Sequence, residues 1–282
     1  MTDKVNRFLQ FHLNKENLKY RTTAVYPDNV KLNSAEILRV FYEREKPILF
    51  PEDIFGFNRT ISNIATDKMC MTNFIADFSW ALKNGFNKIR EELVSLLENA
   101  TNKEFYKDAI TSIDLTLEFV KKYREEAKKQ NNDKLYSALE VVPFNQPNDY
   151  YQALVFMKIL IFSLRASGAD HVTLGRFDQY LLPYFNKSLE KGVKKEELLE
   201  QTELFFISIN FDTDLYRGIQ RGDNGQSLVI GGLTTDNTEG FNALSDVVLQ
   251  SSLELTLIDP KINLRVSKNT PAERYTEATK LT

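Results

Sequence analysis

Polar and glycine-rich residues gather at the ends of short apolar stretches in the last third of the chain. One group runs from His171 through Gly175-Arg-Phe-Asp178, and a second runs from Arg221 to Gly232. In α/β proteins, ligand pockets are built at the tips of strands and the mouths of helices. These two groups are therefore the first candidates for chemistry.

His171 and Thr173 are two positions apart in an apolar stretch that is typical of a strand, so we expect them to share one face. Such a polar pair could bind a substrate hydroxyl or carboxylate. The alternative is that His171 only makes structural hydrogen bonds, as most isolated histidines do, and both interpretations stay open.

Arg176 and Asp178 stand at the expected junction between this strand and a helix. A guanidinium could clamp an anionic substrate group through two parallel hydrogen bonds. The more common arrangement is an Arg176–Asp178 ion pair that locks the turn. We therefore assign both residues as structural or pocket-supporting.

Asp223, Asn224, Gln226 and Ser227 form a polar cluster before the apolar segment that ends at Gly231-Gly232. Gln226 and Ser227 point to opposite faces if the strand has already begun, so one of them lines a pocket while the other does not. We assign Asp223 and Asn224 as pocket-supporting. The paired glycines lack the Lys-Ser/Thr ending of a phosphate loop, which argues against nucleotide binding.

The composition excludes several classes of function. The formal charge of −3 gives no reason to expect a nucleic-acid partner, and no apolar run is long enough to span a membrane. Two histidines and one cysteine, Cys70, offer no metal-ligand spacing, so we expect no metal site and an inert, buried thiol. The amino terminus lacks a secretory pattern and the single cysteine suits a reducing compartment, which together predict a cytoplasmic protein.

Helical patterns fill the first half of the chain. We expect helices after the capping boxes Asn33–Glu36 and Thr101–Glu104, over 73–97 with a bend at Gly85, and from Asn148 or Asp149 to Gly168. Strands are expected over 171–174, 227–230 and 261–266, and helices after Asn242 and after the cap at Thr270. This alternation predicts an α/β fold with a mainly parallel sheet beneath helices. The last helix reaches Thr282 without a stop signal, so we expect a piece of a larger fold.

Three blocks taken in order resemble the amino-terminal part of a glycyl-radical enzyme of the pyruvate formate-lyase superfamily. They are Leu174-Gly-Arg-Phe-Asp-Gln-Tyr180, Gly222-Asp-Asn-Gly-Gln-Ser227 with Gly231-Gly232, and Leu264-Arg-Val266. The stretch Phe177-Asp-Gln-Tyr180 is more similar to the dehydratase and amine-lyase branches. The resemblance implies one partial domain over residues 1–282: a helix-rich layer over 1–168, and part of a ten-stranded barrel, its first half-barrel, over 169–282. It also implies a homodimer.

The resemblance implies radical chemistry on a small polar metabolite. In that family a radical on a carboxy-terminal glycine passes to a cysteine inside the barrel, after a separate iron–sulfur enzyme has installed it with S-adenosylmethionine. Neither the glycine nor the cysteine segment has a match among these residues. We therefore expect no catalytic residue, no bound cofactor and no activity from this chain alone.

The resemblance also assigns pocket walls. The matching positions lie around His171, Thr173, Gln226 and Ser227, and Asn73 falls near a position where several relatives carry a substrate-contacting histidine. Three alternatives remain for the whole: a split enzyme completed by a second polypeptide, a non-catalytic scaffold derived from the family, or a truncated sequence.

Overall fold

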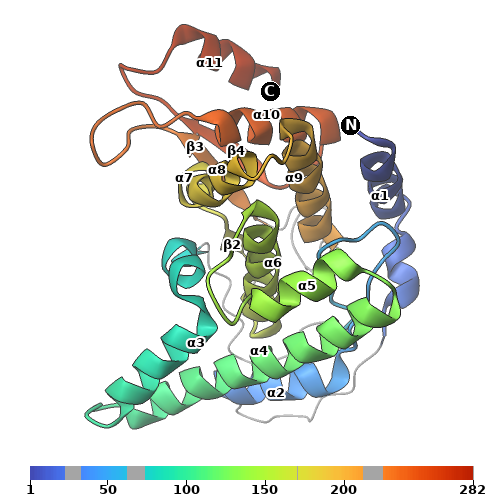
Figure 1. Ribbon diagram of the computed structural model, residues 1–282, viewed down its shortest axis with the longest axis vertical. Coiled ribbons are helices and arrows are strands. Elements are labelled where there is room, and N and C mark those ends of the chain that lie inside the picture. The colour runs from blue at the N-terminus through green and yellow to red at the C-terminus, as the bar shows by residue number, and fades with distance from the viewer. Residues whose placement is uncertain (23–32, 62–73, 170, 212–224, 282) are drawn as a thin grey trace.

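The computed structural model describes residues 1–22, 33–61, 74–169, 171–211 and 225–281 (Figure 1). Up to residue 166 the chain is mostly helical. The elements in this part are α1 (Asp3–Leu13), the 3-10 helix η1 (Glu16–Tyr20), α2 (Ser34–Arg44), β1 (Phe74–Ile75), α3 (Phe78–Leu97), α4 (Lys103–Lys129), α5 (Asp133–Val141) and α6 (Tyr150–Ala166).

Strands and helices then alternate. The elements are β2 (Val172–Thr173), α7 (Phe177–Tyr180), α8 (Leu182–Glu190), α9 (Lys195–Asn210), β3 (Ser227–Gly231), α10 (Ala243–Leu255), β4 (Lys261–Arg265), α11 (Ala272–Ala278) and the 3-10 helix η3 (Thr279–Leu281). The helix-rich α/β class predicted from the sequence is confirmed.

Three helices begin at the capping residues that the sequence predicts. Asn33 caps α2 in a capping box: its Oδ1 accepts from the Glu36 amide at 2.8 Å, and the Glu36 carboxylate accepts from the Asn33 amide at 2.9 Å. Asp149 caps α6 by accepting from the amide of Gln152 at 3.0 Å. Asn242 caps α10 in the same way.

Two expected caps are wrong. The helix α4 is capped by Asn102, whose Oδ1 accepts from the Phe105 amide at 3.2 Å, so no box begins at Thr101. The hydroxyl of Thr270 donates to Glu239 at 2.7 Å, and α11 begins after Pro271 without a side-chain cap. The Thr270 hydroxyl therefore binds Glu239, which is distant in sequence, and does not cap α11.

The segment expected as one helix over 73–97 contains a strand and a helix. β1 precedes α3, and Asp77 caps α3 by accepting from the Trp80 amide at 2.9 Å. The bend at Gly85 is confirmed, with φ +70°; a Cβ there would lie 2.6 Å from the Asn145 backbone. Only glycine allows both this conformation and this close approach.

All strand pairings between named strands are parallel. β1 pairs with β2 and β3 pairs with β4, with Ser227 opposite Lys261 and Gly231 opposite Arg265. A bridge between Gly175 and Leu228 links the two pairs. The Leu174 amide donates to the Ser227 carbonyl at 2.7 Å and the Val229 amide donates to the Gly175 carbonyl at 2.8 Å, so two residues oppose one in a β-bulge at Gly175.

The two central helices are joined by buried cations. α6 and α9 bury residues around most of their circumference. Lys158 of α6 donates to the Ser208 carbonyl at 2.6 Å, and Arg165 donates to the Ile209 carbonyl at 3.3 Å. Positive charge at the carboxyl end of a helix is stabilising because the last carbonyls carry partial negative charge.

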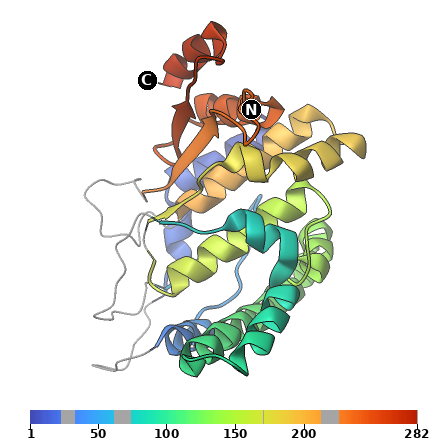
Figure 2. The same cartoon turned by 90° about the vertical axis from the view of Figure 1, so that its left-hand side faces the viewer.

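The two ends of the molecule are formed by different helices and strands. β3, β4, α10 and α11 lie at one end, together with both chain termini, and α2 and α4 lie at the other (Figures 1 and 2). None of the helices described is long and apolar enough to cross a bilayer.

Candidate functional site

The parallel strands have one buried face and one open face. Val172, Gln226 and Leu228 are fully buried against the helices. Thr173 and Ser227 are half-buried on the opposite face. We call this surface, formed by Ile75, Thr173, Ser227, Val229 and Asn263, the open strand face.

The strand register extends this face to both neighbouring strands. Ile75 lies opposite Thr173 and is 62% exposed, and Asn263 lies opposite Val229. The same register puts the exposed Lys261 opposite Ser227, so the face mixes hydroxyl, amide and apolar groups with a cation at the β4 edge, as a small polar ligand needs from a binding wall.

His171 lies at the start of this face and is half-buried. Its carbonyl accepts from the Phe74 amide at 3.4 Å, which ties it to the pairing of β1 with β2. Gly225 has φ +64° and approaches the imidazole so closely that a Cβ would lie 2.6 Å from Cγ of His171. The beginning of β3 therefore packs directly on this ring.

The hydroxyl proton of Thr173 is used in a hydrogen bond within the sheet. Its Oγ1 donates to the Phe74 carbonyl at 2.9 Å, across the β1–β2 pair. A hydroxyl keeps two acceptor lone pairs when its proton is used, so Thr173 presents an acceptor to the open strand face.

Gln226 and Ser227 separate as the alternation of a strand requires. Gln226 is 0% exposed and donates to the Ile209 carbonyl of α9 at 3.2 Å. Ser227 remains half-buried on the open strand face. Of the two, only Ser227 is placed to touch a ligand there.

Arg176 holds the end of β3. Its guanidinium donates to the carbonyls of Gly231 at 2.6 Å and Leu233 at 2.9 Å. Within the described residues no ion pair joins Arg176 to Asp178, although the guanidinium charge still acts to lower the pKa of Asp178, and the expected lock is replaced by a fork on two backbone carbonyls. The physical reason is that both groups have partners around the loop after β3: Arg176 binds the Gly231 and Leu233 carbonyls, and Asp178 binds the Gly231 amide and the Ser245 hydroxyl.

Asp178 organises the same loop from the buried side. It is 0% exposed, and its Oδ2 accepts from the Gly231 amide at 2.8 Å and from the Ser245 hydroxyl at 2.6 Å. Burial raises the pKa of Asp178, while the hydrogen bonds from Ser245 and Gly231 act in the opposite direction. The carboxylate therefore fixes β3 relative to α10 and does not face a ligand.

Several contacts around this loop were not predicted from the sequence. The Gln179 amide donates to the Gly240 carbonyl at 2.7 Å, and Asn242 donates to the Asp178 carbonyl at 3.0 Å. Gly231 and Gly232 both have positive φ beside Arg265 of β4, which explains the pair as a tight turn. The glycine pair and the Asn242 cap were visible signals, but their partners are distant in sequence.

The remaining candidates are placed as follows. Asn73, Asp223, Asn224 and Cys70 lie outside the described residues. His12 packs on Phe211, with ring centroids 5.4 Å apart. Within the part of the chain that the structure describes, no three His, Cys, Asp or Glu side chains are grouped for a metal ion.

Comparison with known proteins gives the class to which this site belongs. Residues 50–282 match the family described as pyruvate formate lyase-like. The chain belongs to this family, and the resemblance to glycyl-radical enzymes with dehydratase-like relatives is confirmed.

Two curated relatives illustrate the match. The chain is 31% identical over 166 residues to the 4-hydroxyphenylacetate decarboxylase glycyl radical subunit of Clostridioides difficile, covering 55% of this chain and 18% of that protein. It is 25% identical over 224 residues to the (2S)-3-sulfopropanediol dehydratase of Klebsiella oxytoca, covering 70% of this chain and 27% of that protein.

A solved structure shares the fold. The structure described for 1,2-propanediol dehydration in Roseburia inulinivorans superimposes with a TM-score of 0.83 at 14% identity, over 100% of this chain and 49% of that one. The chain thus spans about half the length of this structure, and less than a third of the length of the two curated relatives.

Proposed function

We propose that residues 1–282 form the amino-terminal part of a glycyl-radical lyase of the dehydratase-like branch, as one partial domain whose strands belong to the first half of a ten-stranded barrel. The observation that carries this proposal is the open strand face. Among the described residues, helices cover its parallel strands on one side, and half-buried hydroxyls lie on the other. The family match over residues 50–282 supports the same reading.

In this proposal the chain binds and orients a small polar substrate. The Thr173 hydroxyl accepts a hydrogen bond at the wall, the Ser227 hydroxyl accepts or donates one, and His171 lies at the edge of the wall. Arg176 and Asp178 act as positioning residues, because each fixes the Gly231 end of β3 through contacts at 2.6 to 2.9 Å. Holding a substrate in a reactive orientation is a major part of the work of an enzyme.

The hydrogen-abstracting cysteine and the radical glycine are proposed to belong to polypeptide outside these residues, either continuous with this chain or supplied by a second chain. On this view the chain alone is inactive, and the complete enzyme needs an activating enzyme that uses S-adenosylmethionine and an iron–sulfur cluster. We also propose a homodimer. The single cysteine among 282 residues supports a reducing location such as the cytoplasm.

The test uses the complete, anaerobically activated enzyme and the substrate on which it shows turnover. Thr173→Val and Ser227→Ala remove one hydroxyl each from the open strand face. We expect KM to rise by about tenfold for at least one of them, because a lost hydrogen bond to a substrate costs about 1 kcal/mol or more. The glycyl-radical content, measured by electron paramagnetic resonance, should equal that of the wild type.

Ser137→Ala is the matched control, since Ser137 is an exposed serine on α5. It should leave kcat and KM unchanged. If both face variants also keep the wild-type KM and kcat, the open strand face is not the substrate wall and the proposal fails.

A further inference from the structure

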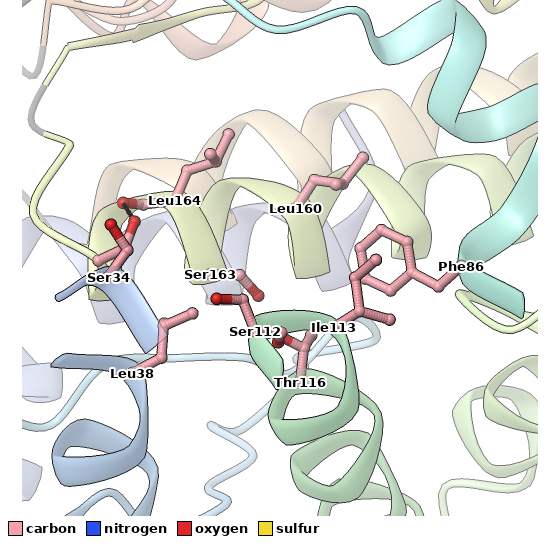
Figure 3. Close-up of a pocket in the computed structure, with 10 residues that line it drawn as sticks. Ser34, Leu38, Phe86, Ser112, Ile113, Thr116, Leu160, Ser163 and Leu164 are labelled. Atoms are coloured by element: carbon pink, nitrogen blue, oxygen red, sulfur yellow. Dashed lines mark hydrogen bonds between the residues drawn. The ribbon is translucent and has the colours of Figure 1, made fainter. Parts of the chain in front are cut away.

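A cavity of about 200 Å³ lies in the helical layer, among α2, α3, α4 and α6. Figure 3 shows Leu160, Ser163 and Leu164 of α6 above Ser112, Ile113 and Thr116 of α4. Leu38 and Phe86 close two further sides, and Ser34 and Ser167 complete the lining.

The lining carries no charged side chain. It consists of five apolar residues and five hydroxyl-bearing residues. A ligand with a formal charge would lose its hydration here without gaining a counter-ion, which is costly. The cavity therefore favours an uncharged occupant.

Four of the five hydroxyl-bearing residues in the wall already use their protons in hydrogen bonds. Ser112 donates to the Asp108 carbonyl at 2.8 Å, Thr116 to the Ser112 carbonyl at 2.9 Å, and Ser163 to the Ile159 carbonyl at 2.8 Å. Each of these bonds closes on the preceding turn of its own helix.

Two further bonds complete this pattern. Ser167 donates to the Leu164 carbonyl at 2.8 Å, and the Tyr42 hydroxyl donates to Ser163 Oγ at 3.0 Å. These four hydroxyls therefore direct no donor into the pocket. The pocket offers a ligand its five apolar side chains and the hydroxyl acceptors that remain.

We propose that this cavity is a binding site for a small, uncharged, apolar molecule about the size of a single aromatic ring. Dry cavities of about 150 Å³ lined by leucine, isoleucine and phenylalanine accept benzene, and this pocket, which is open to the surface at Ser34, has room for a ring of that size. The site is separate from the open strand face, because its α6 residues precede β2 and none of its lining residues belongs to a strand. The proposal does not depend on the function proposed above.

Fluorobenzene is a suitable probe, with binding to the full 282-residue chain followed by 19F NMR. We expect saturable binding in the wild type. Ser112→Leu fills the cavity, and the bond that it removes is only a serine-to-carbonyl contact within α4. This variant should weaken probe binding by about tenfold or more, since loss of the cavity removes the buried contacts.

Ser95→Leu makes the same change at an exposed position of α3, outside the cavity, and should bind as the wild type does. Circular dichroism establishes that each variant is folded. If Ser112→Leu does not fold, the smaller Ser112→Val takes its place, with weaker binding again expected. Absence of saturable binding to the wild type, or unchanged binding to the folded cavity-filling variant, would overturn the proposal.

Discussion

The Cα of Gly225 lies so close to the imidazole of His171 that a Cβ at Gly225 would approach Cγ of the ring to 2.6 Å. This contact joins Gly225, two residues before β3, to His171, the residue before β2. Because Thr173 and Ser227 follow these positions by two residues each, it also sets the spacing of the two hydroxyls on the open strand face.

Gly225→Ala should therefore disturb the wall. The substitution introduces both a strained φ of +64° and a clash with His171, and we expect a loss of more than about 1 kcal/mol in the free energy of unfolding. Urea denaturation measures this loss. Gly192→Ala is the matched control, because Gly192 has φ +84° but its Cβ would meet nothing within 4 Å. Equal losses in the two variants would show that the contact with His171 is unimportant.

Gln226 and Ser227 should respond oppositely to substitution. Gln226→Leu removes a buried hydrogen bond to the Ile209 carbonyl, which keeps its bond from Arg165, so the free energy of unfolding should fall by about 0.5–1.5 kcal/mol. Ser227→Ala should change it by less than about 0.5 kcal/mol, as is usual for positions away from the core. Thermal or urea unfolding of the two variants makes the comparison. A larger loss for Ser227→Ala would contradict the assignment of the two faces.

Arg176→Lys should loosen the loop after β3. Lysine cannot reproduce the fork that binds the Gly231 and Leu233 carbonyls, although it keeps the charge. We expect faster limited proteolysis within residues 232–240 and a loss of about 1–3 kcal/mol. Arg7→Lys changes an exposed ion pair with Glu52 and should have little effect. Unchanged proteolysis in Arg176→Lys would show that the loop is held by other contacts.

Glu203 gives the chain a specific pH dependence. Burial, followed by the charge of the nearby Glu254, raises the pKa of Glu203 from 4.5 to about 8. Because the folded state binds a proton that the unfolded chain has released, the contribution of Glu203 to the free energy of unfolding falls as pH rises from 4.5 to about 8.

Glu203→Gln should flatten this part of the stability profile and raise stability above pH 8 relative to the wild type. Urea denaturation at a series of pH values tests it. Glu196→Gln, at an exposed position of the same helix, should keep the wild-type profile. A wild-type slope in Glu203→Gln would contradict the assignment.

Local signals in the sequence predicted local structure well. The capping residues Asn33, Asp149 and Asn242 and the bend at Gly85 follow from the chemistry of neighbouring residues, and all four are confirmed. β1 was missed because a two-residue strand is defined by its partner, and Phe74 pairs with Val172 far along the chain. The helix α5 was not anticipated either.

In the candidate site, too, local features could be predicted from the sequence and contacts between distant residues could not. Alternation along a strand correctly predicted that Gln226 and Ser227 face opposite ways, but only the packing of α9 decides which of them is buried. Asp178 meets its partners Gly231 and Ser245 across 53 and 67 residues of sequence. No spacing rule links positions so far apart, which is why the expected Arg176–Asp178 pair was wrong.

The most direct test of the central claim is a structure of the complete, substrate-bound enzyme that contains these residues. The open strand face should then line a closed pocket, with a polar atom of the substrate within about 3.5 Å of Thr173 Oγ1 or Ser227 Oγ. A substrate bound elsewhere, with Thr173 and Ser227 facing solvent, would contradict the claim that this chain provides the wall of the reaction chamber.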